Sequence, residues 1–226
     1  MKDFLHHTFG TMNVKTFVGG FDKNLCHLIW CNESNEATLI DASVEIIPIV
    51  EFIEANDLNL RKVIITHSHH DHIQFLNDWK FQFPAIQICG YKVPNKDFGK
   101  YYQKLEHNEI ISVGKELLTI LYTPGHYSDS ICIWNVKAKI LFTGDTVFVG
   151  RTGRVKSASS SIEELYESVY DIILKLPKST TVHPGHHYGF KKSISIQENI
   201  PLSPFFQCKD LDEFKKVMED FERNRR

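Results

Sequence analysis

The stretch KVIITHSHHDHIQF, from Lys62 to Phe75, contains four histidines and one aspartate within residues 67–72. The apolar run VIIT before them is typical of a buried strand, so the polar cluster follows where that strand is expected to end. A turn from a strand into a helix can aim several imidazoles and a carboxylate at one point, and these ligands suit zinc, iron and manganese. A solvated loop would account for isolated histidines but not for their position after this strand. The stretch therefore predicts a metal site at a strand end.

Three later segments end in the same way. A strand in LLTILYTPGH turns on Pro-Gly and presents His126, and another in AKILFTGD ends in glycine and presents Asp145. The segment TVHPGHHYG turns again on Pro-Gly and presents His186. One such strand end is weak by itself, because a Gly-Asp pair after a strand is more often a turn than a ligand. Four of them in this order indicate one shared site.

With these residues in this order, the sequence resembles the metallo-β-lactamase superfamily, whose H-x-H-x-D-H signature is followed by a turn histidine, a strand-end aspartate and a last histidine. The resemblance covers most of the chain. It implies an α/β fold, a four-layered αβ/βα sandwich of two mixed β-sheets flanked by helices, with metals in the cleft at one edge of the sheets. It also implies two ligand sets, His67, His69 and His126 for the first metal and Asp71, His72 and His186 for the second, with Asp145 bridging both.

This ligand arrangement implies hydrolytic chemistry. Two cations about 3.5 to 4 Å apart can share a water, lower its pKa towards neutrality and stabilise the oxyanion that forms when the metal-bound hydroxide attacks a carbonyl. No protein nucleophile is then required. Asp145 would hold both ions and Asp71 would orient the hydroxide. The expected catalytic residues are therefore His67, Asp71, His126 and Asp145.

Within the superfamily, the sequence is similar to the glyoxalase II and persulfide dioxygenase branches, through TPGH, FTGDTVFVGRTGR, LYESVYDIILKLP and HPGHHYG. Three positions depart from those branches. Phe75 replaces the glycine that follows the signature, Tyr127 replaces the threonine after the turn histidine, and RTGR over 151–154 replaces a GCGR-like segment. These departures leave every expected metal ligand unchanged and concern the substrate pocket, which Tyr127 is expected to narrow.

The length of the chain predicts one domain over 1–226, with a short C-terminal tail and helix from about residue 190. The separate helical domain that binds glutathione in glyoxalase II is not expected. The tail segment ENIPLSP also lacks the basic residue that contacts glutathione in the dioxygenases. The basic residues that could hold a substrate carboxylate instead are Arg151, Arg154, Lys191 and Lys192.

Two enzymatic interpretations are open. In the first, two divalent ions, with zinc expected before iron or manganese, hydrolyse a thioester such as an acyl-glutathione. In the second, His67, His126 and Asp145 bind a single Fe(II) and the protein is a persulfide dioxygenase. We favour hydrolysis, because it needs the second-site residues that the other mechanism only tolerates. A third interpretation, a non-catalytic metal-binding scaffold, agrees poorly with a complete ligand set that leaves metal positions open.

The composition narrows the partners. The chain has 26 basic and 28 acidic residues, a formal net charge of −2 and a pI near 6.6, so we expect no nucleic-acid partner. A secretory signal and an apolar run of about 20 residues are both missing from the sequence, which predicts a cytoplasmic protein without a membrane segment. The five scattered cysteines form no C-x-x-C pair and are expected to be reduced and buried. The expected partner is a small-molecule thioester, and monomer and homodimer both stay open.

The sequence also predicts the main elements. The runs VKTFVGG, NLCHLIWC and ATLIDAS favour an antiparallel meander, and apolar spacing predicts helices over 44–57 and 71–81. A further helix is expected over 162–176, opened by a capping box of Ser161 and Glu164. Asp210 and Glu213 are expected to cap a last helix that ends the chain. This order predicts two sheets packed face to face with helices outside.

Overall fold

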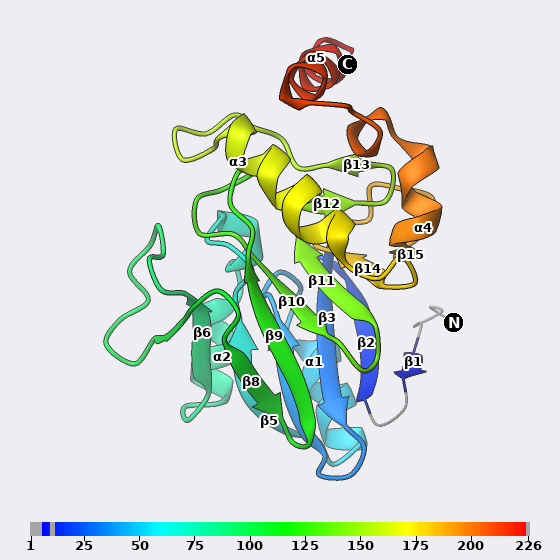
Figure 1. Ribbon diagram of the computed structural model, residues 1–226. Helices are drawn as coiled ribbons and strands as arrows, with labels where there is room; N and C mark the ends of the chain where they lie inside the picture. Colours follow the sequence, from blue (N-terminus) through cyan, green and yellow to red (C-terminus); the bar gives the residue numbers. More distant parts are fainter. Residues whose placement is uncertain (1–5, 10–11, 225–226) are drawn as a thin grey trace.

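The computed structural model describes residues 6–9 and 12–224, and it contains two β-sheets packed face to face (Figure 1). The first sheet consists, in spatial order, of β1 (His6–Phe9), β2 (Met12–Gly19), β3 (Asn24–Cys31), β4 (Glu36–Ile40), β5 (Asn59–Ile64), β6 (Gln87–Tyr91) and β7 (Gln103–Leu105). The second consists of β15 (Ile194–Ser195), β14 (Thr181–Pro184), β11 (Ile140–Gly144), β10 (Ile131–Asn135), β9 (Glu116–Tyr122) and β8 (Ile110–Val113). A short ribbon pairs β12 (Val147–Phe148) with β13 (Arg151–Thr152).

Both sheets are mixed, as the sequence predicts. Strands β2 to β4 form the predicted antiparallel meander, which β1 extends, and β4 to β7 then pair in parallel. In the second sheet, only β11 and β14 pair in parallel. The helices are α1 (Ile47–Ala55), α2 (Leu76–Gln82), α3 (Ile162–Glu167), α4 (Ile196–Asn199) and α5 (Leu211–Arg223).

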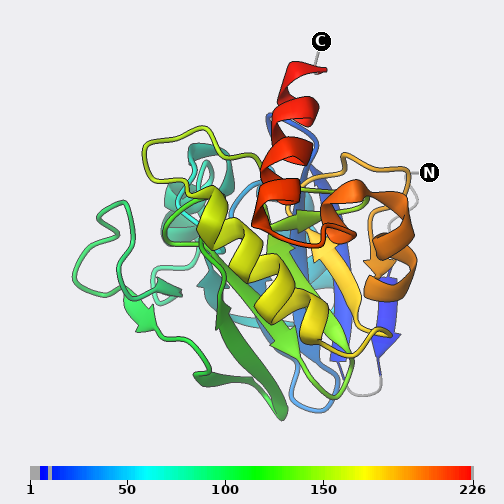
Figure 2. The same ribbon diagram turned by 45° about the horizontal axis from the view of Figure 1, so that its top comes forward.

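Three apolar clusters bind the layers together. One lies between the sheets and includes Ile29 and Ile64 from the first and Ile133 and Phe142 from the second. The other two lie on the outer faces, where α1 and α2 cover the first sheet and α3 to α5 cover the second (Figures 1 and 2). This is the predicted four-layered sandwich. The five cysteines are free and buried, which confirms the prediction made for them.

The helix expected over 71–81 begins later than predicted. Residues His70–His72 form one 3-10 turn, and α2 starts only at Leu76. The reason is a pair of contacts to Ala42, whose N–H donates to the His72 carbonyl and whose carbonyl accepts from the N–H of Phe75. These bonds connect the turn to the strand end of the first sheet, so a helix cannot use the same groups.

The helix expected over 162–176 is present, but only its first part is α-helical. It begins as α3, continues as a π-helical turn (Ser168–Ile172) and ends in a 3-10 turn (Ile173–Lys175). Ser161 accepts the N–H of Glu164, which is one half of the predicted capping box. The complete capping box of the described chain is at Ser195 and Glu198, at the start of α4, and the sequence interpretation missed it.

Helix α5 begins and packs as predicted. Asp210 accepts the N–H of Glu213 at 2.9 Å, and the Glu213 carboxylate accepts the N–H of Lys209 at 2.8 Å. Phe214 and Met218 bury the apolar face of the helix in the outer cluster, where the Phe214 ring contacts those of Tyr166 and Phe205. Among the residues described, no helix is long and apolar enough to cross a membrane. That residues 1–226 form one domain, without a separate glutathione-binding domain, stays a prediction.

The fold places four strand ends at one edge of the sandwich. In the second sheet β9, β11 and β14 run in the same direction, because β10 is antiparallel to both β9 and β11. The carboxyl ends of strands that run in one direction lie at the same edge, where ligands commonly bind. The loop after β5 reaches this edge from the first sheet, and it carries the H-x-H-x-D-H signature.

Candidate metal centre

All seven residues predicted as metal ligands come together at this edge. Within the described residues, their donor atoms form three overlapping groups, and the atoms of each group lie within 4.8 Å of one another. Two of them are the predicted ligand sets: we call His67, His69 and His126 the first group, and Asp71, His72 and His186 the second group. The remaining combination, His67, His72 and Asp145, overlaps both.

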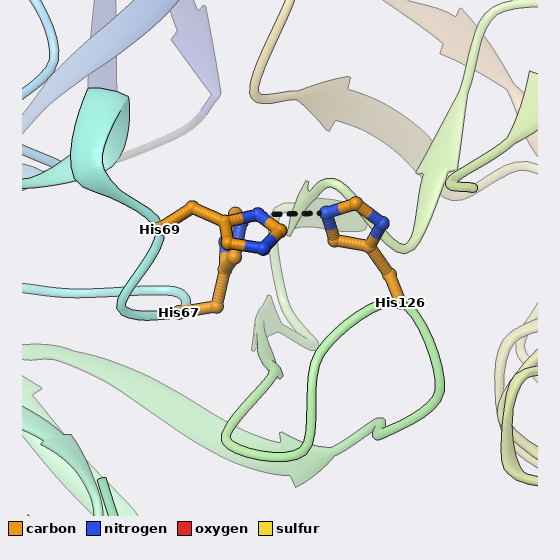
Figure 3. Close-up of side chains that lie close together, drawn as sticks. All are labelled: His67, His69 and His126. Atoms are coloured by element: carbon orange, nitrogen blue, oxygen red, sulfur yellow. Dashed lines mark hydrogen bonds between the residues drawn. The ribbon is translucent and has the colours of Figure 1, made fainter. Parts of the chain in front are cut away.

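The first group is made of three converging imidazoles. Nε2 of His67 lies 2.9 Å from Nδ1 of His69, and Nε2 of His126 lies 3.1 Å from the same Nδ1. Figure 3 shows His69 and His126 facing each other from two different loops, with His67 beside them. Ring nitrogens that converge in this way offer the donor set that zinc prefers.

The second group combines a carboxylate with two imidazoles. Oδ2 of Asp71 lies 3.2 Å from Nε2 of His186 and 3.6 Å from Nε2 of His72, and the two Nε2 atoms are 3.2 Å apart. The other contact of Asp71 Oδ2 is with Asn24, whose amide donates to it at 2.9 Å. Asn24 thereby fixes the carboxylate that the sequence expected to orient the attacking water.

Asp145 lies between the two groups. Its Oδ1 is 3.2 Å from His72 Nε2, and its Oδ2 is 3.3 Å from His186 Nε2 and 3.6 Å from His126 Nε2. Although Oδ1 is buried, it meets no donor in hydrogen-bonding geometry. A buried carboxylate oxygen in that position costs free energy unless a cation or donor compensates it. The donor set therefore fits divalent cations on both sides of Asp145.

Two glycines allow this close approach. A Cβ atom at Gly185 would lie 2.6 Å from Asp145 Oδ1 and 2.7 Å from His72 Cε1. A Cβ atom at Gly153 would lie 2.0 Å from the Asp145 carbonyl oxygen and 2.9 Å from His126 Cγ. Any side chain at either position would push the cluster apart.

Burial keeps the rings of the first group neutral. Burial, reinforced by the charge of His72, holds the pKa of His67 well below its ordinary value. Burial together with His126 lowers the pKa of His69 to about 4. The neutral imidazole is the form that binds a metal, so neither ring must lose a proton first.

Neighbouring carboxylates raise the pKa values of the two rings in the second group. Burial opposes charge on the rings, but Asp145 and Asp41 raise the pKa of His72 well above its ordinary value, and Asp145 raises that of His186 to about 9. Burial also opposes ionisation of Asp145, whereas His186 and His72 hold its pKa well below the ordinary range. A divalent cation bound here would displace the protons, so its affinity depends on pH.

Asp41 is a functional residue that the sequence interpretation missed. Its carboxylate accepts Nδ1 of His72 at 2.7 Å, the N–H of Thr66 at 2.7 Å and the hydroxyl of Thr66 at 2.8 Å. The first bond turns Nε2 of His72 towards the cluster, as partners of metal-ligating histidines commonly do. The signal was present in ATLIDAS, where an aspartate follows a strand in the same way as Asp145.

Two further rings, those of His186 and His126, are also oriented through Nδ1. His186 donates to the Asp22 carbonyl at 2.8 Å, and His126 donates to the Arg154 carbonyl at 2.8 Å. Both acceptors belong to the backbone, so no side chain in the sequence marks them.

His27 supports the strand end that precedes His186. This buried ring donates from Nε2 to the Pro184 carbonyl at 3.0 Å and accepts at Nδ1 from the Thr16 hydroxyl at 3.0 Å. Burial lowers its pKa to about 4, despite the Pro184 carbonyl. Because the folded pKa lies below the unfolded value near 6.5, the unfolded chain binds the extra proton and stability falls as pH drops from about 6.5 to 4.

We therefore expect acid sensitivity that depends on His27. In urea unfolding, the free energy of unfolding of the wild type should fall by up to about 3 kcal/mol between pH 7 and 4 because of this residue. His27→Gln cannot titrate, so the variant should be less stable at pH 7 but should lose less stability on acidification. Equal slopes of stability against pH in the two proteins would contradict this assignment.

The candidate substrate residues do not all lie at one place. A pocket of about 240 Å³ next to the cluster is lined by Arg151 and Arg154, together with cluster residues. Lys191 and Lys192 are not part of that lining, and Lys191 instead pairs with Glu198 at 3.6 Å. The two lysines lie on the segment that follows the last loop of the cluster, and their role as substrate residues stays a prediction.

Tyr127 covers the first group from outside. Its ring centroid lies 4.1 Å from that of His69 and 6.1 Å from that of His67. This placement agrees with the expectation that the tyrosine narrows access on this side.

Aromatic residues that the sequence interpretation missed form one wall of this pocket. Tyr188 stacks on His186 with ring centroids 4.7 Å apart and donates its hydroxyl to Asp22. The Arg151 guanidinium lies 4.0 Å above the Tyr188 ring and 5.2 Å from the Phe148 ring. Tyr188 follows a predicted ligand by two positions and could have been suspected from HPGHHYG, whereas nothing marked Asp22 or Phe148.

Comparisons with known proteins agree with this geometry. The sequence model of the metallo-beta-lactamase superfamily matches residues 19–186. The chain is 29% identical over 216 residues to the probable polyketide biosynthesis zinc-dependent hydrolase PksB of Bacillus subtilis (strain 168), covering 92% of each protein. It is 33% identical over 172 residues to the hydroxyacylglutathione hydrolase of Legionella pneumophila (strain Corby), covering 76% of this chain and 62% of that protein. The crystal structure of ETHE1 from Myxococcus xanthus superposes with a TM-score of 0.82 at 28% identity, covering 92% of this chain and 90% of that one.

Proposed function

Because the chain belongs to the metallo-beta-lactamase superfamily and is a metal-dependent hydrolase of that fold, we propose that it hydrolyses a thioester, such as an acyl-glutathione or a related acyl-thiol. The observation that carries the proposal is the position of Asp145, whose two oxygens face both groups of donors. Names of relatives support it, since one is a zinc-dependent hydrolase and another a hydroxyacylglutathione hydrolase.

Each part of the donor set has a distinct place in this proposal. His67, His69 and His126 would hold one ion, and Asp71, His72 and His186 would hold the other, with Asp145 shared. When bound, two such ions supply a nucleophilic hydroxide at neutral pH and stabilise negative charge on the attacked carbonyl.

The chain's own residues then position the reaction. Asn24 holds Asp71 in the orientation that suits a hydrogen bond from the attacking water. Tyr127 covers the first group, and Tyr188 lies against His186, so the substrate carbonyl would enter between these two rings. We assign binding of a substrate carboxylate to Arg151, because it lines the pocket beside the cluster and its guanidinium lies over the Tyr188 ring. The Arg154 guanidinium makes two hydrogen bonds to Glu222, so we assign it to the support of the site.

A second candidate is a mononuclear iron persulfide dioxygenase, which would use only His67, His126 and Asp145. The contact of 3.6 Å between His126 and Asp145 is compatible with it. The ordered second group favours hydrolysis, because Asp41, Asn24 and the Asp22 carbonyl all orient residues that one iron would leave unused.

An assay that follows both reactions tests the proposal. Zinc-loaded protein should hydrolyse S-lactoylglutathione and an acyl-coenzyme A, or at least one of them, without consuming oxygen. Chelation should abolish hydrolysis, and added zinc should restore it. Hydrolysis that survives complete chelation, or the absence of thioester hydrolysis from metal-loaded protein, would overturn the proposal.

A further inference from the structure

We propose that Glu222 on α5 is a positioning residue for the metal centre, acting through Arg154 on His126. The inference rests on the proposed function only in taking His126 as a metal ligand. It adds that the C-terminal helix, which contributes no ligand, sets the geometry of the first group.

The Glu222 carboxylate joins two basic side chains of the segment after β13. It accepts Nε of Arg154 at 2.6 Å and Nη2 of Arg154 at 2.8 Å, and Nζ of Lys156 lies 2.6 Å away. The hydrogen bond from Arg154 lowers the pKa of Glu222 to about 2, so the carboxylate is charged at any working pH. A bidentate pair between arginine and a carboxylate fixes orientation as well as distance, which a single lysine contact does not.

The backbone of Arg154 contacts the metal centre directly. Its carbonyl accepts Nδ1 of His126 at 2.8 Å. With the proton of the ring on Nδ1, the lone pair of Nε2 points towards His69 and Asp145, which lie 3.1 and 3.6 Å away. The carbonyl therefore selects both the tautomer and the direction of the ring.

The segment that carries this carbonyl is irregular. Residues 153–160 belong to no helix or strand, since β13 ends at Thr152 and α3 begins at Ile162. Gly153 donates to the Thr146 carbonyl at 3.2 Å, and the Ser160 hydroxyl donates to the His126 carbonyl at 2.8 Å. Between these two points, Val155 packs against the outer apolar cluster of the second sheet, and the two hydrogen bonds to Glu222 connect the Arg154 side chain to α5.

Helix α5 is suited to this role because it is itself anchored. Figure 2 shows it beside α3, at the end of the molecule where β12 and β13 lie. Phe214 and Met218 are buried, and the Phe221 ring lies 5.7 Å from that of Phe205. Glu222 follows Phe221, so packing of the aromatic ring fixes the start of the carboxylate side chain.

Neutralising Glu222 should weaken the first metal site without removing a ligand. Glu222→Gln keeps the size of the side chain but loses the charge and one acceptor oxygen of the bidentate pair. We expect the affinity of the first group for zinc to fall about ten-fold, at the low end of the effects seen for groups that orient metal ligands. The kcat should fall while KM changes little, because His126 and not the substrate is displaced. Glu219→Gln is the matched control, because Glu219 is an exposed acid on the same helix.

The test is zinc competition against a chromophoric chelator with the full chain, together with the visible spectrum of the cobalt-substituted protein. Glu222→Gln should bind zinc more weakly and change the cobalt spectrum, whereas Glu219→Gln should match the wild type. Arg154→Gln should weaken zinc binding to a similar extent, and adding Glu222→Gln to it should weaken binding no further, since residues in one chain of contacts are not additive. Glu222→Asp should restore part of the affinity.

Two results would overturn the inference. One is zinc affinity and a cobalt spectrum in Glu222→Gln equal to those of wild type. The other is a loss of thermal stability in that variant with unchanged zinc affinity, which would make Glu222 a structural residue only. Failure of the wild type itself to bind zinc would count against the proposed function, so the two failures are distinguishable.

Discussion

Asp145→Ala is expected to abolish both metal occupancy and hydrolysis. The two oxygens of this carboxylate lie within 3.6 Å of His72, His126 and His186, so its removal takes a donor from both sides of the centre at once. Loss of the shared ligand also leaves the remaining histidines without the negative charge that balances two cations. Single substitutions of neighbouring ligands affect one group, whereas this substitution affects both.

The measurement is elemental analysis of the purified variant together with thioester hydrolysis. Metal content should fall from two ions per chain to nearly none, and activity should fall to background. Asp78→Ala is a suitable control. Asp78 is an exposed aspartate on α2 and is not one of the candidate ligands. Circular dichroism should show that both variants fold. Full metal content in Asp145→Ala would refute the bridging assignment.

Asp41→Asn is expected to have the second largest effect. Asp41 has a positive φ of 61°, a conformation that asparagine tolerates better than most residues, so the substitution changes charge more than backbone. The amide can no longer accept from all three of the donors on Thr66 and His72. Loss of such an orienting partner typically costs 10- to 100-fold in metal affinity, roughly. We expect that loss at the second group, where His72 belongs.

Stability should fall as well, because a buried donor left without an acceptor costs about 1–3 kcal/mol. Zinc titration of the wild type and the variant, with urea unfolding of both, separates the two effects. Unchanged affinity for both zinc ions would contradict the role of Asp41.

The sequence identifies the seven residues that the fold brings together, and the reason is physical. Each ligand follows an apolar strand, and hydrophobic periodicity locates strands before their partners are known. His126, Asp145 and His186 are therefore visible as polar residues at the ends of apolar runs. The same apolar runs also predict that a sheet lies inside the sandwich. All residues of NLCHLIWC are buried in β3, as expected for a strand whose sheet is covered on both faces.

The parts that escaped prediction depend on long-range contacts. The carbonyls of Asp22 and Arg154 orient two ligands, but a carbonyl belongs to every residue and carries no sequence signal. The hydrogen bonds between Arg154 and Glu222 join positions 68 residues apart, and only tertiary packing of α5 brings them together. The start of α2 was misjudged for the same reason, because Ala42 takes the hydrogen bonds of the turn from outside the segment.

The position of the candidate substrate residues also depends on long-range contacts that the sequence does not reveal. A basic residue has no periodicity that marks which side of the fold it will face, so four were proposed and the structure places two beside the pocket. Of these, Arg154 is held by α5 and Arg151 lies on the aromatic wall.

The most direct test of the central claim is the metal content of active protein, measured by elemental analysis on a sample whose oxygen uptake and thioester hydrolysis are followed in parallel. A dinuclear hydrolase predicts two metal ions per chain, and thioester hydrolysis without oxygen consumption. One iron per chain, with oxygen uptake that requires a persulfide, would contradict it.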